Sequence, residues 1–484
     1  MRETPTSGRR PNLLYIHSDQ HNPFVTGCYG DSVVQTPHLD GLASRGVTFT
    51  NAYCPSPVCV PSRMAMLTGK YPHELDVWTN HHILGSDHPT LAHAMGAAGY
   101  RPVLMGRMHS VGIDQLHGYA ERPIGDHGSN HPGGGEVPRE ARASLENSGA
   151  GQSGYQVHDE DVTAATVDFL NRFGIRRRAG VNDEPFCLSV GYILPHAPYV
   201  ARRADFDRYR DRVTLPRVRT PFDDRLHPFE AWWRSWSSVE EVSDDVILRA
   251  RAAYWALIDR MDALIGDILE ALRRNGLEEN TLIVYHSDHG DMAGEHDLWM
   301  KRCHYEASAR IPAIVSWPGA LPQGVTCDRV VSALDLNATM LEALGAEPLP
   351  GSHGRGLLDL LAGRQADWED LAFCEYCVYE GWTTRMIRRD DWKFIYYHGH
   401  RPQLFNLRED PDEVADRSGD PACAALVREL TAAVLADWDP DAVERKMDER
   451  RRATDLIARW SRETGAPEQF VWRRNPAMDY VEPG

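Results

Sequence analysis

The sequence predicts an α/β protein with a large mixed, mostly parallel β-sheet flanked by helices, followed by a smaller C-terminal α+β part that contains an antiparallel sheet. Up to about residue 365, apolar runs alternate with helical patterns, which is typical of parallel strands joined by helices. Beyond that point, short strand-like runs follow one another across short turns, as in antiparallel sheets. We therefore expect a large domain over 1–365, a small antiparallel-sheet domain over 366–440, and a C-terminal helix and tail over 441–484.

The large domain is built from strand and helix patterns in alternation. Apolar runs with polar ends predict buried strands over residues 11–19, 47–53, 101–106, 186–193, 281–291 and 309–319. Periodic apolar positions bounded by proline or glycine predict helices over residues 37–46, 61–70, 89–100, 158–173 and 243–275. Residues 125–154 are rich in Gly, His and Ser, and we expect a long loop there that covers the site.

The C-terminal part is patterned differently. Short runs of β-branched and aromatic residues predict strands over residues 371–377, 383–389, 392–398 and 402–407. A helical pattern over 421–437 follows them, then a charged helix over 440–463 and an irregular tail. The charged helix and the tail either contact a neighbouring subunit or form a solvated end.

Composition and charge exclude several classes of protein. The chain carries 52 basic and 70 acidic residues, for a net charge of -18, which argues against nucleic acid as a partner. No run reaches the roughly 18 apolar residues that a membrane helix needs, so no membrane association is expected. The polar first residues lack a secretory signal pattern, and the expected location is the cytoplasm.

The cysteine content does not indicate a disulfide framework. Nine cysteines are spread over 484 residues, unlike the dense spacing of small secreted domains. Cys374 and Cys377 form one CxxC pair, but a structural zinc site would need a second pair. We interpret this pair as coincidental.

Acidic residues end two of the predicted parallel strands. Asp19 closes the first strand, and Asp288 with His289 closes the strand that begins at residue 281. Ligands of such folds bind at the carboxyl ends of strands, and oxygen donors with one imidazole suit a hard divalent cation. The alternative is that each aspartate caps the helix after its strand. Together the residues predict one divalent metal ion, with Ca²⁺ expected and Mn²⁺ or Mg²⁺ as alternatives.

Cys59 lies in the segment SPVCVPSRMAMLTGKYP, just before the predicted helix over 61–70. Backbone N–H groups and the helix dipole favour negative charge at that position, although a free cysteine is commonly a small buried hydrophobic residue. Cys59-x-Pro61-x-Arg63, followed by Leu-Thr-Gly, resembles the signature of the sulfatase family. That resemblance implies an alkaline-phosphatase-like fold and oxidation of Cys59 to formylglycine by a formylglycine-generating enzyme.

The metal motifs resemble one branch of that family, which contains choline sulfatase and phosphonate monoester hydrolase. Many sulfatases carry two consecutive aspartates where this chain has Asp19-Gln20, and Asp-Asn where it has Asp288-His289. The resemblance to the branch implies four metal ligands: Asp19, Cys59 as formylglycine, Asp288 and His289. It leaves open whether Gln20 contacts the metal.

Four further residues match the family at its spacing, and a fifth departs from it. Asn80 lies twenty-one residues after Cys59, and Lys301 lies thirteen residues after Asp288. GRMH (106–109) resembles the family's Gly-Lys-x-His, which gives His109 and puts Arg107 in place of the lysine, while LPHAPY gives His196.

The resemblance also implies how these residues act. Arg63, Lys301, Asn80 and Arg107 would bind the non-bridging oxygens of the substrate. His196 and Lys301 would protonate the leaving alcohol. His109 would deprotonate the second hydroxyl of the hydrated aldehyde and so expel sulfate.

The predicted function is metal-dependent hydrolysis of small-molecule sulfate monoesters with formylglycine made from Cys59. The alternative is a phosphonate monoester or phosphodiester hydrolase with the same nucleophile and metal site, and a third interpretation is a homologue that is non-catalytic or lacks the modification. The alcohol part of the substrate is open: the 125–154 loop lacks the Trp and Phe residues of an aromatic cage for choline. Substitutes for that cage, or core residues, are Trp232, Trp233, Trp236 and Tyr376. By analogy with the branch, we expect a homo-oligomer.

Overall fold

The computed structural model describes residues 9–132, 140–181, 184–223, 225–365 and 367–482. Within these ranges the main sheet has nine strands, in the order β11-β2-β10-β8-β1-β6-β3-β4, with β9 paired to β2. The strands are β1 (Asn12–Asp19), β2 (Val47–Tyr53), β3 (Pro102–Gly106), β4 (Glu121–Ile124), β6 (Cys187–Pro195), β8 (Thr281–Ser287), β9 (Arg310–Ile311), β10 (Ala313–Ser316) and β11 (Val325–Ser332). Pairing is parallel except at β10 and β9, which confirms the predicted mixed, mostly parallel sheet.

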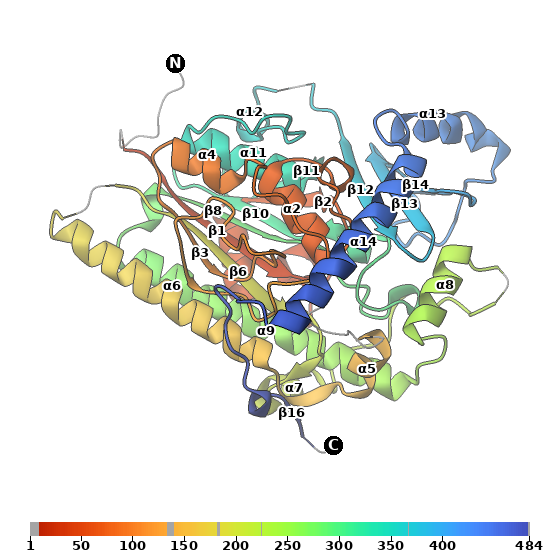
Figure 1. Ribbon diagram of the computed structural model, residues 1–484, viewed down its shortest axis with the longest axis horizontal. Helices are drawn as coiled ribbons and strands as arrows, with labels where there is room; N and C mark the ends of the chain where they lie inside the picture. The colour runs from red at the N-terminus through yellow and green to blue at the C-terminus, as the bar shows by residue number, and fades with distance from the viewer. Residues whose placement is uncertain (1–8, 133–139, 182–183, 224, 366, 483–484) are drawn as a thin grey trace.

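Helices cover both faces of this sheet (Figure 1). On one side, α9 (Asp244–Arg274) packs against α1 (Pro37–Ser44) and α6 (Gly154–Arg178), and both α6 and α9 contact β6. On the other side lie α2 (Cys59–Thr68), α4 (Leu91–Ala97) and α11 (Ala333–Leu344). The other helices described before the C-terminal sheet are α3 (Pro72–Leu75), α5 (Glu140–Glu146), α7 (Arg203–Tyr209), α8 (Pro228–Ser237), α10 (Glu306–Ala309) and α12 (Leu358–Leu361).

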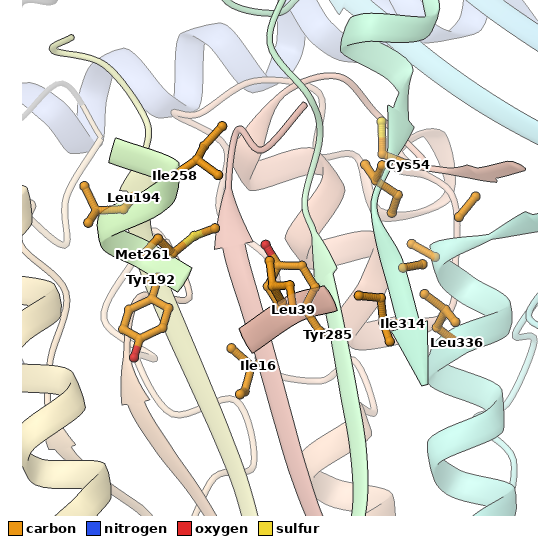
Figure 2. Close-up of a cluster of buried hydrophobic side chains, with 14 of the residues drawn as sticks. Ile16, Leu39, Cys54, Tyr192, Leu194, Ile258, Met261, Tyr285, Ile314 and Leu336 are labelled. Atoms are coloured by element: carbon orange, nitrogen blue, oxygen red, sulfur yellow. The ribbon is translucent and has the colours of Figure 1, made fainter. Parts of the chain in front are cut away.

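The sheet is buried because its central strands carry apolar side chains on both faces. Figure 2 shows Ile16 of β1 and Tyr285 of β8 in the core beside Leu39 of α1, with Met261 of α9 close by. The two strands pair in register from residue 12 to residue 18. Their carboxyl ends therefore lie at the same edge of the sheet, which is where the candidate site is found.

The C-terminal sheet has four antiparallel strands, as predicted. They are β12 (Leu371–Val378), β13 (Trp382–Arg389), β14 (Trp392–Tyr397) and β15 (Gln403–Asn406). They are followed by α13 (Ala424–Val434) and by the charged helix α14 (Pro440–Thr464). The domain boundaries at 365 and 440 remain predictions.

Three local expectations need correction. Helix α2 begins at Cys59 instead of residue 61, because Val58 is the extended residue that precedes it. The 125–154 segment is not a continuous loop, since it contains α5 and β5 (Gly149–Gln152), while residues 133–139 lie outside the described ranges. The tail is not irregular throughout: β16 (Tyr480–Val481) pairs with β5, which also pairs with β7 (Val200–Ala201).

Across the described part of the chain, we find no helix with both the length and the apolar character required to cross a bilayer.

Candidate active site

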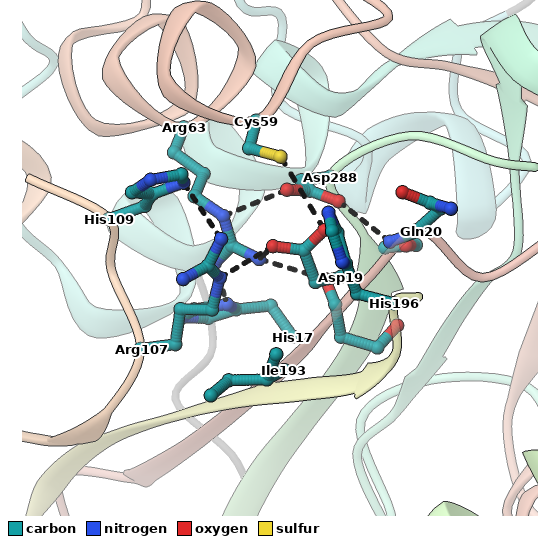
Figure 3. A network of polar contacts seen from close by, with 12 residues as sticks. His17, Asp19, Gln20, Cys59, Arg63, Arg107, His109, Ile193, His196 and Asp288 are labelled. Carbon is teal, nitrogen blue, oxygen red and sulfur yellow. Dashed lines mark hydrogen bonds and ion pairs between the residues drawn. The ribbon is translucent and has the colours of Figure 1, made fainter. Parts of the chain in front are cut away.

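Four side chains converge at the carboxyl edge of the main sheet. Asp19 ends β1, Asp288 and His289 follow β8, and Cys59 is the first residue of α2. One potential ligand atom from each lies within 4.8 Å of the others, and all four residues are buried. Figure 3 shows Asp19 and Asp288 facing Cys59 across this cluster. The two strands deliver their carboxylates together because they pair in register.

The thiol of Cys59 is surrounded by cationic and imidazole groups. Its Sγ lies 3.0 Å from Lys301 Nζ, 3.3 Å from His289 Nε2 and 3.5 Å from Asp19 Oδ1. Burial raises the pKa of the thiol, but Lys301 and His289 outweigh it and hold the pKa well below its usual value. This environment stabilises negative charge at the position of residue 59.

Arg63 is fully buried one turn after Cys59 and holds both carboxylates. Its Nε donates to Asp288 Oδ2 over 2.8 Å, and its Nη2 donates to Asp19 Oδ2 over 3.2 Å. Its Nη1 lies 2.7 Å from His17 Nδ1. The guanidinium therefore fixes the Oδ2 atoms and leaves both Oδ1 atoms directed at Cys59 and His289.

Arg107, the residue after β3, reaches the same aspartate and links it to two other residues. Its Nε donates to Asp19 Oδ2 over 2.5 Å, its Nη1 donates to Asp126 Oδ1 over 3.1 Å, and its Nη2 lies 2.8 Å from His109 Nδ1. Burial and the neighbouring Cys59 raise the pKa of Asp19, whereas the positive charges of Arg107 and Arg63 lower it. The lowering is the larger effect, so the net pKa of Asp19 falls below its ordinary value. Asp19 is therefore ionised near neutral pH.

Gln20 contacts Lys301. Its Oε1 accepts from Lys301 Nζ over 2.7 Å, and its Nε2 donates to Asp291 Oδ2 over 2.6 Å. Its backbone N–H also donates to Asp288 Oδ1 over 3.1 Å. Both polar ends of the Gln20 amide thus have protein partners, which favours a role in orienting Lys301.

The remaining predicted residues also lie around Cys59. Asn80 Oδ1 accepts from the N–H of Val60 over 3.0 Å and so supports the first turn of α2. His109 and His196 also lie near Cys59 and help to lower the pKa of its thiol. His196 Nδ1 donates to Ala197 O over 2.6 Å, so its Nε2 is the nitrogen without that carbonyl contact.

The predicted aromatic residues divide into two groups. Trp233 and Tyr376 are buried, whereas Trp232 and Trp236 are half-buried on α8 and stack with centroids 5.9 Å apart. The Arg302 guanidinium lies 4.7 Å from the Trp236 centroid, and the Arg302 N–H donates to Pro57 O over 3.2 Å. The half-buried pair is thus connected to the segment that carries Cys59.

Cys374 and Cys377 do not form a joint site. They are three residues apart on β12, so their side chains lie on opposite faces of the strand. Cys374 Sγ lies 3.9 Å from Cys54 Sγ, whereas Cys377 packs in a separate apolar cluster.

Four residues in contact with the site were not predicted from the sequence: His17, Asp126, His127 and Asp291. His17 and Asp291 each lie within three residues of a predicted metal ligand, and this closeness in sequence could have identified them as site residues. Asp126 and His127 lie in a Gly-rich stretch with no periodic pattern, so no comparable signal marked them.

Comparison with known proteins identifies the family. Residues 11–346 match the Sulfatase family model, and residues 294–437 match the model described as N-sulphoglucosamine sulphohydrolase, C-terminal. The chain belongs to the sulfatase family, which confirms the resemblance drawn from Cys59, Pro61 and Arg63, and it is a sulfatase enzyme.

Three similar proteins were compared with the chain, and the first of them supports the expected branch. Choline-sulfatase from Rhizobium meliloti (strain 1021) is 31% identical over 469 residues, covering 91% of this chain and 89% of the relative. Arylsulfatase K from Bos taurus is 29% identical over 442 residues, covering 84% and 78%. The crystal structure of the phosphonate monoester hydrolase of Agrobacterium radiobacter has a TM-score of 0.73 at 22% identity, covering 88% and 95%. That last likeness confirms the alkaline-phosphatase-like fold.

Proposed function

We propose that the protein hydrolyses sulfate monoesters with a formylglycine nucleophile made from Cys59 and with one divalent metal ion. The observation that carries this proposal is the buried cluster of Cys59, Asp19, Asp288 and His289. Lys301 Nζ, only 3.0 Å from Cys59 Sγ, adds the positive charge that a sulfate group requires. Membership of the sulfatase family supports the reaction class.

The donor set fits a hard divalent cation. Asp19, Asp288, His289 and the oxygen of modified residue 59 would hold the ion; two carboxylates among the donors suit Ca²⁺, Mn²⁺ and Mg²⁺ alike, and Ca²⁺ is the ion that we propose. Arg63 and Arg107 support this fit because they occupy Oδ2 atoms and leave Asp19 Oδ1 directed at residue 59, while Asp288 Oδ1 also accepts from the N–H groups of Gln20 and His289. When bound, the ion supplies Lewis-acid stabilisation of negative charge at residue 59 and at the sulfate.

The modification supplies a hydrated aldehyde, with one hydroxyl to attack sulfur and a second whose proton can be removed to expel sulfate. A thiol lacks this second hydroxyl. His109 and His196 both lower the pKa of the Cys59 thiol, and we assign one of them to accept a proton there and the other to donate to the leaving alcohol. His109, next to Arg107, is assigned the first role, and His196, with Lys301, the second.

The other charged and polar groups bind or position. Lys301 contacts the non-bridging oxygens of the substrate. Arg107 and Asn80 are assigned to bind the negative charge on the same oxygens. Arg63 has three of its nitrogens on protein acceptors, which favours a positioning role for it.

The alternative activity is hydrolysis of phosphonate monoesters or phosphodiesters. Both substrate classes present a tetrahedral monoanion, so the same cationic groups would serve either. The 31% identity with a choline-sulfatase over most of both chains favours sulfate. We also propose a cytoplasmic, homo-oligomeric enzyme matured by a formylglycine-generating enzyme.

Peptide mass spectrometry of residue 59 tests the nucleophile. Protein co-expressed with a formylglycine-generating enzyme should show the mass of an aldehyde at residue 59, bind one divalent ion per chain, and release sulfate from an aryl sulfate. Undiminished sulfate release by protein that retains the thiol would overturn the proposal.

A further inference from the structure

The C-terminal segment crosses the edge of the active site on its own chain. We call residues 466–482 the C-terminal strap; in Figure 1 it is the dark blue chain that leaves α14 and runs down to β16. The N–H of Asp126 donates to Phe470 O over 3.0 Å, and the N–H of Trp472 donates to Asp126 O over 2.7 Å. Gln469 N also donates to Asn130 Oδ1 over 2.6 Å. The strap therefore pairs with Asp126 through both of that residue's backbone groups.

Two glycines allow the strap to approach this closely. A Cβ atom at Gly125 would lie 1.5 Å from Phe470 O, and one at Gly151 would lie 2.1 Å from Tyr480 O. Neither position can accept a side chain without displacing backbone. By contrast, a Cβ at Gly128, three residues further on, would meet nothing within 4 Å.

The side chain of Asp126 points away from the strap and into the active site. It is 5% exposed, its Oδ1 accepts from Arg107 Nη1 over 3.1 Å, and its Oδ2 accepts from the His109 N–H over 2.7 Å. Arg107 in turn donates to Asp19 Oδ2. A continuous set of hydrogen bonds thus runs from the strap through Asp126 to Arg107, His109 and Asp19.

Side chains of the strap hold it in place beside this contact. Trp472 Nε1 donates to Asp161 Oδ2 over 2.8 Å, and the Trp472 ring meets His158 edge-on with centroids 5.3 Å apart. The Arg474 guanidinium lies 5.7 Å from the ring of Tyr155, whose centroid lies 6.0 Å from that of His196. The strap therefore also supports a residue next to the proposed proton donor.

We infer that the C-terminal strap is a working part of the active site in its own chain, and that Asp126 is the positioning residue through which it orients Arg107 and His109. The inference rests on the proposed function, in which Arg107 binds the charge of the substrate and His109 accepts a proton from residue 59. The Asp126 carboxylate supplies an acceptor to both residues, and the strap fixes the backbone from which that carboxylate projects.

The first test compares Gly125→Ala with Gly128→Ala in the full chain, using steady-state hydrolysis of an aryl sulfate by metal-loaded protein modified at residue 59. Gly125→Ala should displace the strap and lower kcat about ten- to a hundredfold, the usual effect of losing a positioning contact. Gly128→Ala should stay within about twofold of wild type. KM, metal content and the thermal midpoint separate a positioning effect on kcat from loss of the fold.

A second test releases the strap after folding. A protease site placed between Gly465 and Ala466 is cut, the strap is removed by gel filtration, and a synthetic peptide of residues 466–482 is then added back. The strap-free protein should lose kcat to the same extent as Gly125→Ala and regain at least about half of it with the peptide, as expected for a cut segment that rebinds. A structural role alone would give no recovery.

Different results would overturn the inference about the C-terminal strap and the proposed function. If wild type hydrolyses the aryl sulfate and both Gly125→Ala and the strap-free protein match it, the inference about the strap is overturned while the proposed function stands. If wild type with modified residue 59 hydrolyses neither sulfate nor phosphonate esters, the proposed function itself fails.

Discussion

Arg63 Nε lies 2.8 Å from Asp288 Oδ2, and both side chains are fully buried. The same guanidinium contacts Asp19 Oδ2, so one residue of α2 fixes the carboxylates at the ends of β1 and β8. Such a fork geometry is specific to arginine, since lysine offers a single point charge.

Arg63→Lys should therefore weaken metal binding. We expect the affinity for the divalent ion to fall about ten- to a hundredfold, because supporting residues of metal ligands have effects of that size. Isothermal titration of the metal-free protein measures it. Arg385→Lys is a matched control, since Arg385 is also buried and ion-paired, but with Glu375 and Asp437; unchanged affinity in Arg63→Lys would contradict the positioning role.

Cys59→Ala should abolish turnover while leaving the fold intact. Residue 59 is the proposed nucleophile, and covalent catalysis is worth more than about a thousandfold in comparable systems. Activity assays alongside circular dichroism and thermal melting measure both effects. Retention of more than about a thousandth of wild-type kcat/KM would exclude Cys59 as the source of the nucleophile.

The sequence was most informative where local pattern and chemistry coincide. Asp19 and Asp288 could be placed together because parallel strands end at a common edge, and β1 and β8 do pair in register. Cys59 could be placed at a helix start because Pro61 and Gly69 mark the limits of α2 within two residues.

Long-range backbone contacts could not be predicted in the same way. Asp126 contacts Phe470 and Trp472 through its backbone, and neither segment has a periodic pattern that would place it against the other. The partner of Gln20 was equally hidden, because its side chain reaches Lys301 across 281 positions of sequence. Contacts of this kind depend on the folded path of the chain and not on local propensity.

The half-buried Trp236 should influence which alcohols are accepted. The Trp236 ring lies beside Arg302, whose backbone contacts the segment that carries Cys59. Trp236→Ala should therefore raise KM for a bulky sulfate ester about tenfold more than KM for a small one, because a stacked aromatic contact with the bulky alcohol is lost. Steady-state kinetics with a pair of esters measure this difference.

Trp392→Ala is its matched control, since Trp392 is also half-buried beside an arginine, Arg417, at 5.7 Å, but lies in the C-terminal sheet. Equal KM changes for the two esters in Trp236→Ala would show that this residue lies outside the alcohol subsite.

His73 should make stability depend on pH. Burial lowers the pKa of His73, whereas the Glu375 carboxylate raises it, since Glu375 Oε1 lies 2.7 Å from His73 Nδ1. The second effect is larger, so the net pKa of His73 is above 6.5. Because the folded-state pKa exceeds the unfolded value, this stabilisation is complete below about pH 6.5 and is lost as pH rises through the folded pKa. The thermal midpoint of wild type should fall relative to that of His73→Gln over that rise; parallel curves would contradict the assignment.

The central claim is that this buried site cleaves sulfate esters in preference to related tetrahedral monoanions. The most direct test is kcat/KM for an aryl sulfate and an aryl phosphonate monoester, measured side by side on one metal-loaded preparation with Cys59→Ala as the blank. We predict that the sulfate is favoured by at least about tenfold, which corresponds to about 1.4 kcal/mol of transition-state preference. A preference for the phosphonate would leave the fold and the nucleophile in place but contradict the sulfatase activity proposed for this protein.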